Sequence, residues 1–171
     1  MTPATLAIAS DFVRTGIEKA GVPLTATLEA YLSITFARFL GRDVRVDFLT
    51  IRVTRALDAG APRDAIRELA DECLIACAFF EDRLKRQGNV RYYVGLGQAT
   101  YDAAHMTEQA YGFVHMRDVI ASAAEGDRPR DLETLIARAR AGSGTAREDL
   151  ARENVVVGPW GAAAKGGLLW R

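Results

Sequence analysis

The sequence predicts an all-α protein, built as a single bundle of six or seven mostly antiparallel helices. Six stretches before residue 125 repeat apolar residues with helical spacing, and nothing before residue 150 alternates convincingly with a period of two. A chain of 171 residues is long enough for one domain with an apolar core, followed by a tail. We therefore expect a helical bundle domain at 1–124 and, at 125–171, a short helix followed by an irregular Gly- and Ala-rich C-terminal tail.

The first three helices are predicted at about 4–19, 24–40 and 44–59. Gly21 and Gly41 follow the first two, as glycine commonly does at a helix C-terminus. The fourth, at about 62–87, begins with Pro62 at its first position and is apolar throughout 73–80, so we expect it at the centre of the bundle. Its two cysteines, Cys73 and Cys77, are four residues apart and are interpreted as small core residues rather than a disulfide.

The fifth and sixth helices are predicted at about 90–105 and 107–124. The junction AHMTEQ contains no glycine or proline, so a single long helix is the alternative. In the fifth helix, Gly95, Ala99 and Ala103 recur every four residues and form a stripe without bulky side chains. We interpret this stripe as a helix-packing contact, because a phosphate-binding loop would need a strand before it and a third glycine.

An alternative interpretation of the same helices is a metal site. Asp102 and His105 are three residues apart, as are His115 and Asp118, and Glu72 lies on the central helix. Carboxylates and histidines at such spacing bind two metal ions in some helical bundles, so iron, manganese or zinc would be the cofactor of a metal-dependent enzyme or metal binder. This alternative requires the fifth and sixth helices to be separate and antiparallel. The leading interpretation has no cofactor and no catalytic residue.

A third hypothesis places a small-molecule ligand in a buried pocket beside the stripe of Gly95, Ala99 and Ala103, lined by Tyr92, Phe113 and Phe79. The C-terminal tail raises a separate question, because it holds both tryptophans of the chain, Trp160 and Trp170. Two large apolar rings are costly to leave in water, so they either dock on their own bundle or anchor a partner.

Composition narrows the classes of partner. The chain has 22 acidic and 22 basic residues, so it lacks the positive field that nucleic-acid binding requires. No apolar run approaches the roughly 20 residues of a membrane helix, and the N-terminus lacks the pattern of a secretory signal. We expect no nucleic acid and no membrane as partners, and a cytoplasmic location.

The segments LTATLEAYLSITFARFL (24–40) and ECLIACAFFEDRLKRQGNVRYYVGLGQATYDAAH (72–105) resemble an uncharacterised family of all-helical bacterial proteins. The resemblance covers about residues 24–124 and implies a helical bundle, but it brings no activity and no catalytic residue. Together with the absence of catalytic signatures, these observations favour a non-enzymatic interaction or regulatory protein that binds a protein partner or a second copy of itself.

Overall fold

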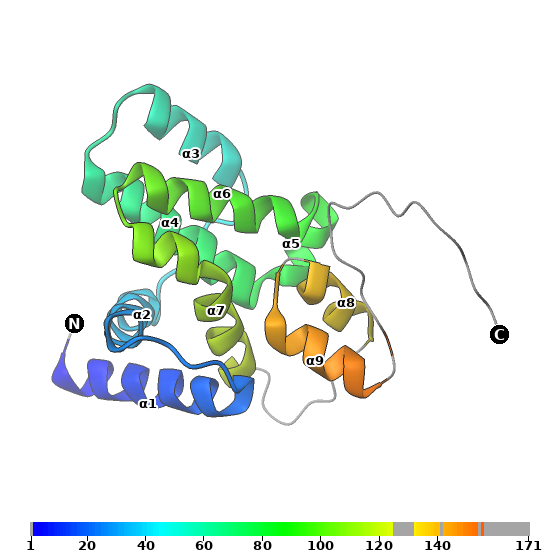
Figure 1. Cartoon of the computed structure of the whole chain (residues 1–171). Coiled ribbons are helices and arrows are strands. Elements are labelled where there is room, and N and C mark those ends of the chain that lie inside the picture. Colours follow the sequence, from blue (N-terminus) through cyan, green and yellow to red (C-terminus); the bar gives the residue numbers. More distant parts are fainter. Residues whose placement is uncertain (1, 125–131, 141, 154, 156–171) are drawn as a thin grey trace.

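The computed structural model describes residues 2–124, 132–140, 142–153 and 155, and this part of the chain is all-helical, as predicted (Figure 1). It contains nine helices, slightly more than expected. They are α1 (Pro3–Ala20), α2 (Ala26–Phe39), α3 (Leu49–Asp58), α4 (Arg63–Phe79), α5 (Glu81–Gln87), α6 (Val90–Ala103), α7 (Thr107–Ala124), α8 (Leu132–Arg140) and α9 (Gly144–Arg152). Among these residues, no helix combines the length and apolar content needed to span a membrane.

Helix α4 occupies the centre of the bundle, as the sequence predicts. Every residue from Ala70 to Ala78 is buried, and α4 packs against α3, α6 and α7. The predicted helix 62–87 is nevertheless two helices, because Phe80 leaves the helical conformation (φ −118°, ψ 30°) and α5 starts at Glu81. No glycine or proline marks this break, so periodicity alone could not locate it.

Helix α3 begins five residues later than predicted. Residues 44–48 run outside the helix, with Val46 buried in the core and Phe48 as the N-cap residue in a left-handed conformation (φ 61°). The carboxylate of Asp47 accepts hydrogen bonds from Arg83 and from Gln87 (2.5 Å) of α5. These long-range contacts fix the segment before α3.

Helices α6 and α7 are separate and form an antiparallel hairpin, which decides between the two alternatives for residues 90–124. The turn between them passes through His105, whose φ of 54° is incompatible with one continuous helix. Across the hairpin, the rings of Tyr101 and Phe113 meet edge to face with centroids 6.1 Å apart.

The C-terminal helices α8 and α9 pack against each other around a small apolar cluster that is distinct from the main core. Two buried polar contacts join this pair to the bundle. Arg138 of α8 donates to Glu81 (3.1 Å), and Ser143, the N-cap residue of α9, donates to Asp118 of α7 (2.5 Å). The predicted tail anchors, Trp160 and Trp170, lie outside the described residues.

Candidate interaction surface

The stripe of Gly95, Ala99 and Ala103 does not pack against another helix in the described structure. All three residues are exposed, and a Cβ added to Gly95 would find no atom within 4 Å. The helix-packing prediction for them is therefore wrong. The spacing correctly places them on one face of α6, but that face points away from the bundle.

Gly97, on the opposite side of α6, is the glycine that close packing requires. A Cβ at this position would overlap the ring of Phe113 and would lie 3.1 Å from the Cβ of Cys73. The inward face of α6 also carries Tyr93, Val94 and Tyr101, all buried. The contact among α4, α6 and α7 thus depends on Gly97.

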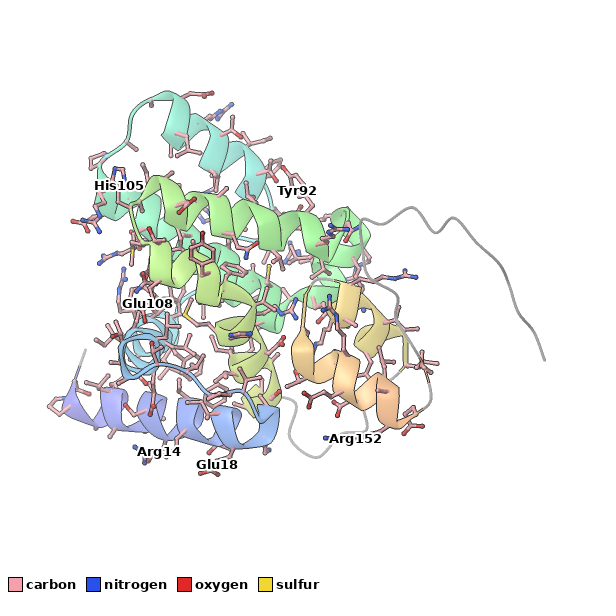
Figure 2. All side chains as sticks on the ribbon, in the orientation of Figure 1. Arg14, Glu18, Tyr92, His105, Glu108 and Arg152 are labelled. Atoms are coloured by element: carbon pink, nitrogen blue, oxygen red, sulfur yellow. The ribbon has the colours of Figure 1, made fainter. Side chains whose placement is uncertain are left out.

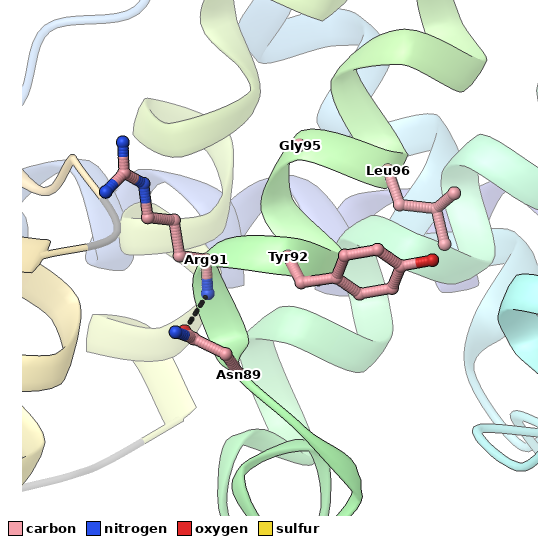
Figure 3. Close-up of a pocket in the computed structure, with 5 residues that line it drawn as sticks. All are labelled: Asn89, Arg91, Tyr92, Gly95 and Leu96. Carbon is pink, nitrogen blue, oxygen red and sulfur yellow. Dashed lines mark hydrogen bonds between the residues drawn. The ribbon is translucent and has the colours of Figure 1, made fainter.

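A shallow groove of about 470 Å³ runs along the outward face of α6 at its N-terminal end, and its lining atoms are almost all apolar. It is lined by Asn89, Arg91, Tyr92, Gly95 and Leu96 (Figure 3). The side chains of Tyr92 and Leu96 extend on the same side of the helix, and a Cβ added to Gly95 would meet no atom within 4 Å. Tyr92 is 51% exposed, so an apolar ring lies open to solvent at the edge of the groove.

A second exposed aromatic ring, that of Phe48, belongs to the neighbouring helix. Helix α3 contacts α6 (Figure 1), and Tyr92 is labelled close to the N-terminal end of α3 in Figure 2. Asp47, the residue before Phe48, is bonded to Gln87, which precedes the groove residue Asn89 by two positions. Phe48 is 73% exposed, and Ile51, one turn further along α3, is 46% exposed.

The backbone of Phe48 is held in its left-handed conformation from both sides. Its neighbours Val46 and Leu49 are each 1% exposed, and Arg52 ties α3 to α4 through two hydrogen bonds to Glu72 (2.5 and 2.9 Å). A left-handed conformation costs a bulky residue about 1–2 kcal/mol. We call Phe48, Ile51, Tyr92, Gly95 and Leu96 the α3–α6 surface.

The five residues predicted as metal ligands do not form a site. Asp102, His105 and His115 are exposed, whereas the carboxylate of Asp118 is buried and accepts from Arg117 (2.5 Å) and Ser143. Glu72 binds the guanidinium of Arg52. Among the residues that the structure describes, no group of three or more His, Cys, Asp or Glu side chains is placed to hold a metal ion. Glu72 and Asp118 therefore have guanidinium partners, Arg52 and Arg117, in place of a metal ion.

The sequence did not reveal the most buried acidic group, Asp71 of α4. Its carboxylate is fully buried and accepts hydrogen bonds from Tyr31 (2.6 Å), Tyr101 (2.7 Å) and Arg38 (3.2 Å). Burial raises the pKa of Asp71 and also the pKa of both tyrosine hydroxyls, which therefore stay protonated and donate. This cluster joins α2, α4 and α6, and with no exposure at Asp71 it has no access for a substrate. Asp71 is one of three acidic residues in the stretch 66–80, with Glu68 and Glu72, so the sequence did not distinguish it.

Of the three residues predicted to line a buried ligand pocket, only Tyr92 lines the groove beside Gly95, and this groove is open to solvent. Phe113 is fully buried against Gly97, and Phe79 stacks on Phe36 with centroids 6.0 Å apart. Both cysteines are free and buried, as predicted, and burial raises the pKa of Cys77 to about 12. They are core residues with little thiolate character.

Comparison with known protein families, curated proteins and solved structures finds no match for this chain. The resemblance to an uncharacterised bacterial family therefore stays a prediction.

Proposed function

We propose that this chain is a non-enzymatic interaction protein that binds another protein through the α3–α6 surface. The observation that carries the proposal is Phe48, an aromatic ring 73% exposed on a left-handed backbone at the N-terminus of α3, the helix that contacts the groove-bearing α6. Exposed apolar patches with an aromatic residue at their centre are typical of protein-binding sites. We expect the protein to act in the bacterial cytoplasm, in keeping with the prediction from its sequence.

Two costs support this proposal over a purely structural role for the surface. The left-handed conformation of Phe48 is unfavourable, and a glycine inside a helix, such as Gly95, costs about 1 kcal/mol relative to alanine. Neither residue returns that cost through packing in the described structure, since the Phe48 ring is exposed and the space at Gly95 is open. Binding energy from a partner would offset both.

The shape of the groove favours a protein over a small molecule. It is shallow and open rather than enclosed, whereas small-ligand sites bury most of the ligand surface. An aromatic or branched apolar side chain from a partner would pack against Tyr92 and Leu96, which line the groove, and the exposed Phe48 ring of α3 would be a second anchor.

Site-specific photo-crosslinking tests the proposal. A photoreactive phenylalanine analogue is placed at position 48 of the full chain in living cells, and a matched variant carries it at position 111, where Tyr111 on α7 is 81% exposed. We expect discrete intermolecular adducts from position 48 and far weaker ones from position 111, with the adduct identified by mass spectrometry. The proposal is wrong if position 48 gives no intermolecular adduct, or only the pattern seen at position 111.

A further inference from the structure

We infer that the chain's own C-terminal segment, residues 156–171, is the resident occupant of the α3–α6 surface and seats an indole ring in the groove beside Gly95. A protein partner would then bind by displacing this segment. The inference rests on the proposed function, because it concerns the same surface, but its test is independent of any partner.

The described structure ends close enough to the groove for the segment to reach it. Val155 is half-buried against the α8–α9 cluster, and its N–H donates to the carbonyl of Leu150 (2.7 Å). Helix α8 contacts α6, the helix that carries the groove. An extended chain spans about 3.4 Å per residue, so the five residues from Val155 to Trp160 can reach at most about 17 Å and the fifteen to Trp170 at most about 50 Å.

The chemistry of the segment matches that of the groove. Its sequence, VVGPWGAAAKGGLLWR, contains both tryptophans and no acidic residue, and its Pro and Gly residues disfavour a helix that would bury them internally. The groove offers apolar walls and, at Gly95, an open space next to an exposed tyrosine ring. Aromatic side chains pack favourably on one another, so an indole against Tyr92 is the contact that we expect.

The covalent link favours this occupant over a second copy. A short flexible tether gives its end an effective concentration in the millimolar range, which far exceeds typical protein concentrations. A weak contact between one indole and the groove is therefore largely formed within the chain.

Tryptophan fluorescence tests the inference directly, because residues 156–171 contain the only tryptophans in the protein. In the native full-length chain we expect emission at shorter wavelength than in a synthetic peptide of residues 156–171. A Cβ at Gly95 meets no atom within 4 Å, so we expect Gly95→Leu to place its side chain in the groove and to move the emission toward that of the peptide. The matched control is Ala103→Leu, an exposed position two turns away on the same face of α6, which should leave the emission unchanged. Circular dichroism verifies that both variants are folded.

Three results would overturn the inference: peptide-like emission from the wild-type chain, a blue shift that Gly95→Leu does not reduce, or a shift that depends on protein concentration. The last would identify a second copy as the source of the indole. The proposed function is tested separately, by the intermolecular adducts formed from position 48. Adducts without the expected fluorescence would remove only the assignment of the occupant.

Discussion

The two faces of α6 use small residues in opposite ways. On the inward face, Gly97 lets the ring of Phe113 and the Cβ of Cys73 approach, and Tyr101 donates to the buried Asp71. On the outward face, Gly95, Ala99 and Ala103 meet solvent. A glycine in a helix is therefore explained by packing only where a neighbour arrives, and Gly95 has none in the described structure.

Helix α3 repeats this contrast at adjacent positions. Leu49 is 1% exposed and belongs to the core, whereas Phe48 is 73% exposed on a strained backbone. The inner residues stabilise the fold. The outer residues cost stability, which is the pattern expected where a surface serves binding rather than folding.

The largest expected loss of stability follows from replacing the buried residue Asp71. Asp71→Ala should lower the free energy of unfolding by about 4 kcal/mol, because it leaves the buried hydroxyls of Tyr31 and Tyr101 and the Arg38 guanidinium without their acceptor. Urea denaturation followed by circular dichroism measures this. Asp71→Asn keeps one acceptor oxygen and should lose much less. Equal losses in the two variants would contradict the role assigned to the hydrogen bonds.

A comparison of wild-type protein with Asp71→Asn should also show that the contribution of Asp71 to stability depends on pH. Burial is the largest cause of the raised pKa of Asp71, so the folded state binds the proton more tightly than the unfolded state, whose value is near 3.8. The contribution of Asp71 is then fully present below that value and is lost as pH rises through the folded pKa. Wild-type protein should lose stability relative to Asp71→Asn as pH increases above about 4. A constant difference across this range would show that burial does not dominate.

A smaller change in stability, of opposite sign, is expected at the exposed residue Phe48. Phe48→Gly should raise the free energy of unfolding by about 0.5 kcal/mol, because glycine accepts the left-handed backbone and little buried surface is lost. The neighbouring Leu49→Ala should instead lower it by about 3 kcal/mol. Thermal melting compares the two variants. A marked destabilisation by Phe48→Gly would mean that the Phe48 ring supports the fold.

The fold class and the central position of α4 could be predicted because both depend on local periodicity. Apolar residues recur at helical spacing along the chain, and the uniformly apolar run 73–80 needs neighbours on all sides. The late start of α3 coincides with a contact between distant residues, Asp47 with Gln87, and the break at Phe80 has no glycine or proline to mark it. Such contacts leave no local signature.

The candidate surface was harder to predict for a related reason. Regular spacing shows which residues share a helix face but not which face points inward. A better signal was present in α6, where Tyr93, Gly97, Tyr101 and Ala104 repeat at three- or four-residue intervals and are all buried. Phe48 was hidden because a positive φ at a residue other than glycine cannot be recognised from the sequence.

Thermal melting of Gly95→Ala and Gly97→Ala tests the central contrast most directly. We expect the two substitutions to shift the melting temperature in opposite directions. Gly95→Ala should be stabilised by about 0.8 kcal/mol, because alanine favours the helix and its single methyl group leaves most of the groove of about 470 Å³ open. Gly97→Ala should be destabilised by about 1–2 kcal/mol, because its methyl group collides with Phe113. A melting temperature below wild type for Gly95→Ala, or above it for Gly97→Ala, would contradict the assignment of an outer binding face and an inner packing face.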